Sequence, residues 1–143
     1  MFFIILTMIV LVMASVHDIR KKEIPFWMLA ACGSIAVLTS AVGIMDGVAA
    51  WNESVCALIP GVLLLLTAYV SRQGLGYGDG LLVLALGPIF GFERIFAGIC
   101  LAFCLSAVFS LGMIAFKRAG RKASFPFIPF LTSAMGVILF AAV

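Results

Sequence analysis

Two aspartates, Asp18 and Asp79, are the residues of this sequence best suited to chemistry. Asp79 follows Gly74-Leu75-Gly76-Tyr77-Gly78 and precedes Gly80, and this run lies between two apolar stretches, residues 60–70 and 81–90. A carboxylate at the edge of hydrocarbon is costly, so its default interpretation is a functional site with a partner, and Asp18 is the best candidate partner. Two carboxylates that meet can share a proton and act as general acid and general base.

Structural explanations remain open for both aspartates. Asp79 could be the N-cap of the segment that follows it, accepting backbone N–H bonds. Asp18 could pair with Arg20 or Lys22 beside the membrane. The other four acidic residues need no functional explanation, since three of them fall in predicted external loops and one lies next to three basic residues: Asp46, Glu53, Glu93 and Glu23.

The composition indicates an integral membrane protein. Of 143 residues, 65% are hydrophobic and only 10% are charged, whereas a soluble domain carries about 25% charged residues. Nine Lys and Arg are too few to predict nucleic-acid binding. The four cysteines form no Cys-x-x-Cys pair and there is a single histidine, His17, so we predict no zinc site and no cofactor.

The elements that must position the two aspartates are six predicted transmembrane helices. A helix needs about 20 apolar residues to cross about 30 Å of hydrocarbon. On that basis the spans cover residues 2–16, 25–44, 54–70, 79–90, 94–116 and 126–142. We therefore predict an all-α, polytopic fold with one membrane-embedded domain, residues 1–143. The first span is predicted to be retained, because no basic segment precedes it.

The distribution of basic residues predicts the orientation of these spans. The loops after the first, third and fifth spans hold eight of the nine Lys and Arg, and the remaining loops hold only Arg94. By the positive-inside rule, both termini lie outside and Asp18 and Asp79 lie on the cytoplasmic side. The fourth span is too short to cross the hydrocarbon, so its Asp79 end is predicted to lie below the membrane surface. A turn at residues 91–94 would close its far end, and Pro60-Gly61 predicts a kink or a packing notch.

Three motifs in this order resemble those of the type IV prepilin peptidases, which are membrane aspartic proteases. The first motif is Asp18-Ile19-Arg20-Lys21-Lys22-Glu23-Ile24-Pro25, and the second is Gly76-Tyr77-Gly78-Asp79. The third is Phe125-Pro126-Phe127-Ile128-Pro129-Phe130-Leu131. The sequence departs from the family pattern at Phe26, where asparagine is frequent, and at Gly80-Leu81-Leu82, where a lysine is usual.

The resemblance implies the roles of particular residues and the class of substrate. Asp18 and Asp79 would be catalytic, and Gly76 and Gly78 would support the second aspartate. Further residues would line the site or bind substrate: Arg20, Lys22, Pro25, Tyr77, Pro126 and Pro129. The substrate would be a prepilin-like precursor with a short basic leader, cut at the cytoplasmic face of the cell membrane. The short first loop without paired cysteines predicts a peptidase without N-methyltransferase activity, and a homo-oligomer is one option for its assembly.

The helix macrodipole suggests how the two aspartates would divide the work. Asp79 at a helix N-terminus would start as the base, and Asp18 near a helix C-terminus as the acid. Two functions from other classes remain open. A small cation- or proton-coupled transporter would use both aspartates as an ion site. A non-catalytic assembly subunit would tolerate asparagine at both positions.

Overall fold

The computed structural model describes residues 2–21, 25–45, 47, 51–70, 76–115 and 127–141. Every regular element in these ranges is an α-helix. The helices are α1 (Phe2–Lys21), α2 (Phe26–Met45), α3 (Trp51–Cys56), α4 (Ile59–Val70), α5 (Tyr77–Phe90), α6 (Phe92–Ala115) and α7 (Ile128–Ala141). The predicted all-α fold is confirmed.

Four stretches of helix are long and apolar enough to cross a membrane. They are Phe2–Arg20, Phe26–Met45, Asn52–Val70 and Phe92–Ala115. Two shorter apolar helices, Tyr77–Phe90 and Ile128–Ala141, complete the described bundle. At 1.5 Å per residue, the 14 residues of α5 extend about 21 Å, less than the hydrocarbon thickness. The membrane class is confirmed, whereas the count of six spans and the orientation of the termini stay predictions.

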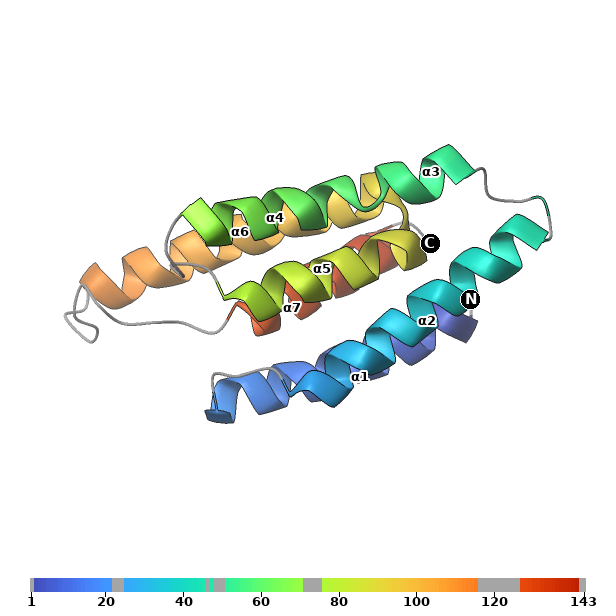
Figure 1. Cartoon of the computed structure of the whole chain (residues 1–143). Helices are drawn as coiled ribbons and strands as arrows, with labels where there is room; N and C mark the ends of the chain where they lie inside the picture. Colours follow the sequence, from blue (N-terminus) through green and yellow to red (C-terminus); the bar gives the residue numbers. More distant parts are fainter. Residues whose placement is uncertain are drawn as a thin grey trace.

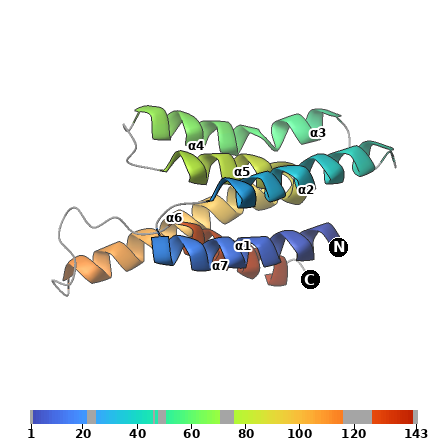
Figure 2. The same ribbon diagram turned by 60° about the horizontal axis from the view of Figure 1, so that its bottom comes forward.

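Six of the helices form two groups of three, and the short connection between α5 and α6 joins the two groups. In one group α5 packs against α2 and α4, and in the other α7 packs against α1 and α6 (Figures 1 and 2). Helix α5 buries residues on nearly every side, among them Leu82, Val83, Leu86 and Ile89. A helix that is apolar all round belongs in the interior of a bundle. The helix that carries Asp79 is therefore the central one.

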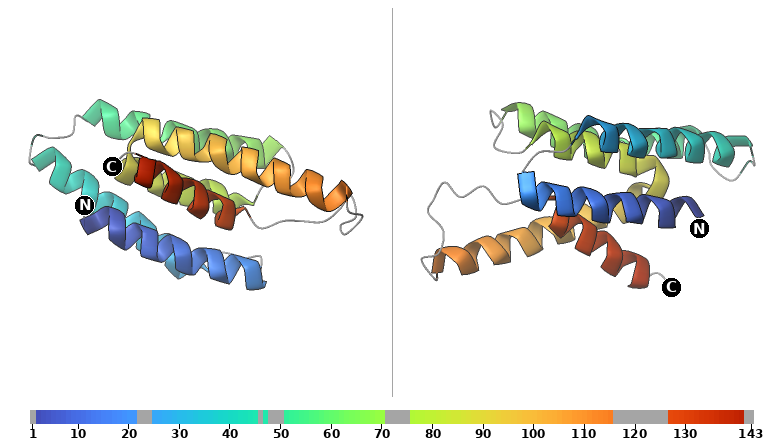
Figure 3. Two further views of the ribbon diagram at one scale, coloured as in Figure 1. Left: turned by 180° about the vertical axis from the view of Figure 1, so that it is seen from behind. Right: turned by 90° about the horizontal axis from the view of Figure 1, so that it is seen from below.

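All the helix ends that carry predicted site residues lie at one end of the molecule. Figure 1 shows the C-terminal ends of α1, α4 and α6 together with the N-terminal ends of α2, α5 and α7. The start of α1 and the end of α7 lie at the opposite end, as the view from behind also shows (Figure 3). Hence Asp18, late in α1, and Asp79, early in α5, are at the same end of the bundle although 61 positions separate them in sequence.

Glycines set the close contact between α4 and α5. A Cβ atom added at Gly61 would overlap the backbone of Leu84, and one at Gly80 would lie 2.8 Å from Cδ2 of Leu65. The predicted packing notch at Gly61 is confirmed. The predicted kink lies slightly earlier, at Ala57–Leu58, where α3 ends before α4 begins. Proline in the first turn of a helix lacks only an N–H that has no intrahelical partner, so Pro60 fits directly after this break.

Three predicted boundaries differ from the structure. Helix α1 continues to Lys21, so Asp18 lies within its last turn and not after it. Helix α5 begins at Tyr77, two residues before Asp79. The predicted four-residue turn at 91–94 is a single residue, Gly91, whose φ of 82° is a conformation that glycine adopts without strain. Its N–H donates to the carbonyl of Gly87, and α6 begins at the next residue.

Candidate active site

Asp18 lies on the buried face of α1. Residues at helical spacing on that face are all buried: Thr7, Leu11, Ala14 and Asp18. Asp18 is 6% exposed, whereas Arg20 on the same helix is exposed. No ion pair joins Asp18 to a cation among the residues that the structure describes. The explanation of Asp18 as a partner of Arg20 is therefore not supported, and Lys22 lies outside the described residues.

The N-terminal end of α7 supplies the polar contact of Asp18. The backbone N–H of Ile128, the first residue of α7, donates a hydrogen bond to the Asp18 carboxyl group. This N–H is free because the first N–H groups of a helix have no intrahelical acceptor. Pro129 follows at the second position, where a missing N–H costs nothing. The third sequence motif thus begins the helix whose first amide contacts Asp18.

The second carboxyl oxygen of Asp18, Oδ2, is buried and has no hydrogen-bond partner among the described residues. A buried polar atom without a partner is uncommon in native structures and calls for an explanation. The exposure of 6% and the contact with Ile128 fix the position of the carboxyl group and leave this one oxygen unused. Such an oxygen is suited to hold or receive a proton.

Asp79 occupies the third position of α5. Its carboxyl group accepts the backbone N–H of Gly76, the N-cap residue, whose own position has no side-chain capping bond. The prediction of Asp79 as the N-cap itself is wrong, because the helix begins two residues earlier and the acid reaches back to the cap. An acidic side chain at the third position is a known way to satisfy the amide of the N-cap. Asp79 is half-buried, less enclosed than Asp18.

Gly76 leaves room for this carboxyl group. A Cβ atom added at Gly76 would lie 3.2 Å from Oδ2 of Asp79 and 3.6 Å from its Cγ. The backbone of Gly76 (φ −66°, ψ 132°) is open to any residue, so the requirement for glycine here comes from the space beside Asp79. Gly78 lies half-buried in the first turn of α5.

The two carboxyl groups lie near enough for their charges to interact. Helices α1 and α5 are in contact, and the charge of Asp18 acts on Asp79. Each carboxyl group also faces a backbone amide at the N-terminal end of a helix, Ile128 for Asp18 and Gly76 for Asp79. A helix N-terminus carries partial positive charge, which stabilises an anion. The arrangement can therefore hold two carboxyl groups that share one negative charge.

The other predicted site residues lie around this end of the bundle, with differing exposure. Tyr77 begins α5 and is 40% exposed, and Pro129 is half-buried in the first turn of α7. Pro25 is half-buried just before α2, and its carbonyl accepts the backbone N–H groups of Met28 and Leu29. The predicted site residues Lys22 and Pro126 lie outside the described residues.

Sequence reasoning missed the amide of Ile128 and the role of Gly80. Pro129 was the signal that could have indicated the Ile128 amide, since proline near the start of an apolar run is typical of the first turn of a helix. Gly80 must be glycine because the side chain of Leu65 in α4 occupies the space beside it. Among the described residues, no three His, Cys, Asp or Glu gather closely enough to hold a metal ion.

Comparison with known proteins adds the following. The family model for the type IV leader peptidase family matches residues 5–143. Two curated relatives match, one from Aeromonas salmonicida (strain A449) and one from Aeromonas salmonicida, both named prepilin leader peptidase/N-methyltransferase. Each is 26% identical over 102 residues, covering 67% of this chain and 35% of the relative. The chain thus spans about a third of the length of these relatives, and no solved structure matches it.

Proposed function

Since the chain belongs to the type IV leader peptidase family, we propose that it is a membrane aspartic endopeptidase that cleaves the leader peptide of prepilin-like precursors. The precursors would be pilins, Flp pilins or pseudopilins with a short basic leader, cut at the cytoplasmic face of the cell membrane. The observation that carries the proposal is that Asp18 and Asp79 lie at one end of the bundle, on helices in contact, with the charge of Asp18 acting on Asp79. Two carboxyl groups near enough to influence each other's charge can act as the general acid and the general base of peptide hydrolysis without a covalent intermediate.

The environments of the two carboxyl groups suggest how they divide the reaction. Asp79 is the less enclosed of the two and would take a proton from the attacking water. Asp18 would carry the proton of the pair on Oδ2, which has no hydrogen-bond partner among the described residues, and donate it to the scissile carbonyl oxygen or to the leaving amine. Because the two groups are coupled, the pair titrates as a unit and a bell-shaped pH–rate profile is expected.

The helix dipoles do not separate these roles. Asp18 lies near the C-terminal end of α1, but the N-terminal end of α7 faces the same carboxyl group through the Ile128 amide. Both aspartates therefore have a helix N-terminus beside them. The assignment of Asp18 as acid and Asp79 as base is supported by the Asp18 oxygen that has no hydrogen-bond partner among the described residues, and not by the dipoles.

The two carboxyl groups of the described site suffice for hydrolysis. The predicted first cytoplasmic loop is short and contains no cysteine. We therefore propose peptidase activity without methyl transfer.

The test is the processing of a co-expressed prepilin in cells that produce Asp18→Asn or Asp79→Asn at equal membrane levels. Asparagine keeps the size of the side chain and removes its acid–base chemistry, so each single variant is expected to lose at least 100-fold in cleavage rate. Glu53→Gln and Glu93→Gln, exposed acids at the opposite end of the bundle, are the matched controls and should cleave normally. Normal processing by either aspartate variant would remove that residue from the mechanism.

The same experiment separates the alternatives. A non-catalytic assembly subunit would be indicated if both asparagine variants supported pilus assembly without any cleavage by the wild type. A transporter would be indicated if the wild type cleaved no precursor and the two variants abolished proton or cation uptake in vesicles.

A further inference from the structure

A long groove runs between α1 and α7 at the end of the bundle opposite Asp18 and Asp79. Its volume is about 810 Å³, and Arg94 is the single charged residue in its otherwise apolar lining. From α1 the lining includes Ile5 and Ile9, which are 58% and 54% exposed, and from α7 it includes Phe140, which is 87% exposed. Exposed side chains of this size in a membrane protein face lipid or a partner.

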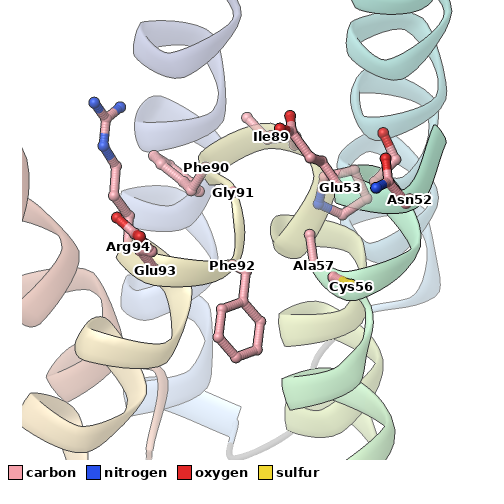
Figure 4. Close-up of a pocket in the computed structure, with 12 residues that line it drawn as sticks. Asn52, Glu53, Cys56, Ala57, Ile89, Phe90, Gly91, Phe92, Glu93 and Arg94 are labelled. Carbon is pink, nitrogen blue, oxygen red and sulfur yellow. The ribbon is translucent and has the colours of Figure 1, made fainter. Parts of the chain in front are cut away.

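Arg94 is the exception to the charge distribution predicted from the sequence, being the one basic residue assigned to the external loops. It lies in the first turn of α6, where its charge adds to the positive end of the helix dipole. No carboxylate of the described residues forms an ion pair with it. Arg94 lines both this groove and the neighbouring cavity, whereas Glu93 lines the neighbouring cavity alone. Figure 4 shows the side chain of Arg94 extending away from Asn52 and Glu53.

The groove does not lead to the catalytic carboxyl groups. On α1 the groove is lined by the face that carries Ile5, Ile9 and Val12. Asp18 lies on the buried face of the same helix, together with Leu11 and Ala14. A substrate helix lying in the groove would therefore meet a different side of α1 from the one that presents Asp18. An occupant that needs no access to Asp18 fits better.

We propose that this groove binds an anionic phospholipid, with an acyl chain against α1 and α7 and the phosphate on Arg94. The apolar walls match a hydrocarbon chain, and one unpaired cation at the end of an otherwise apolar groove matches a single anionic headgroup. An arginine forms two parallel hydrogen bonds with a phosphate, which gives it an advantage over a point charge. The bound lipid would fill the space between the two helices that hold Asp18.

The probe is phosphatidylglycerol with a photoactivatable diazirine in its acyl chain, added to the full-length protein in phosphatidylcholine nanodiscs. We expect crosslinks on the peptides that contain Met8, Met13 and Leu139, which line the groove. Unlabelled phosphatidylglycerol should compete more strongly than phosphatidylcholine. Arg94→Gln should weaken this competition about fivefold, because one cation near an anionic lipid contributes about 1 kcal/mol.

A pair of glycine variants tests the position. A Cβ atom added at Gly136, which lines the groove, would lie in ordinary van der Waals contact, 3.9 Å from Cε of Met8, so Gly136→Leu adds its side chain on the groove side of α7. Gly112→Leu on α6, where an added Cβ meets nothing within 4 Å, is the matched control. Crosslinking should fall at least tenfold in Gly136→Leu and stay unchanged in Gly112→Leu.

Three results would overturn the proposal. Equal competition by the two lipids, unaffected by Arg94→Gln, would show that the headgroup is not recognised. Crosslinks that persist in Gly136→Leu would show that the lipid lies elsewhere. Displacement of the label by a co-purified prepilin would assign the groove to the hydrophobic helix of the substrate. None of these results depends on cleavage, so the proposed peptidase function is tested separately.

Discussion

Replacing Gly76 tests whether the position of the Asp79 carboxyl group controls the reaction. In Gly76→Ala the new Cβ would lie 3.2 Å from Oδ2 of Asp79, closer than such atoms usually approach. The carboxyl group must move by a few tenths of an ångström. A misplacement of 1 Å can cost about 100-fold in rate, so a shift of this size is expected to lower kcat about tenfold and to leave KM unchanged.

Gly76→Ser separates this effect from helix capping. Serine is a better N-cap residue than glycine, whereas alanine is a worse one by about 1 kcal/mol. Both substitutions add the same Cβ, and the backbone of Gly76 is compatible with both. We therefore expect both variants to lose activity, but only Gly76→Ala to loosen the start of α5.

The assay is leader cleavage of a purified prepilin by the enzyme in nanodiscs, together with hydrogen exchange of the amides at the start of α5. Gly33→Ala is the control, since a Cβ at Gly33 meets nothing within 4 Å. It should keep full activity and gain up to about 1 kcal/mol of stability, because alanine is the better residue inside a helix. If Gly76→Ala and Gly76→Ser both cleave within twofold of the wild type, the carboxyl group of Asp79 does not react from the position described here.

Further substitutions test the second carboxyl group and the packing. Ile128→Pro removes the backbone N–H that donates to Asp18, whereas Ile128→Ala loses the isoleucine side chain but keeps this N–H. The proline variant is expected to lower kcat at least tenfold more than the alanine variant. Equal rates in the two variants would refute a role of this amide. Gly61→Ala places its Cβ against the backbone of α5 and should lower the stability by about 1–3 kcal/mol, measured as loss of Tm. The added Cβ of Gly98→Ala meets the flexible side chain of Met135 and the end of Ile138, and no backbone, so this substitution should cost less than about 1 kcal/mol. Similar losses in the two alanine variants would contradict this packing.

The sequence predicted the class of fold and the residues at the centre of the site. A chain with 65% hydrophobic residues can satisfy its backbone hydrogen bonds in lipid only as helices or as a closed barrel, and its long apolar runs favour helices. The family membership inferred from three short motifs is confirmed by the family model over residues 5–143. The proximity of Asp18 and Asp79 was inferred from the side of the membrane on which each should lie, and in the structure they lie on two helices in contact, with the charge of Asp18 acting on Asp79.

Only the tertiary structure decided which groups surround these aspartates. The amide of Ile128 comes from a helix that begins 110 positions after Asp18, and the space at Gly80 is set by Leu65 on α4. The sequence could not supply these neighbours, because helices that are apolar on almost every side show no periodic stripe that marks the packed face. In lipid, moreover, apolar burial does not distinguish one helix neighbour from another, so shape decides the packing. Glycines and the ends of short helices determine that shape, and their contacts exist only once the bundle has formed.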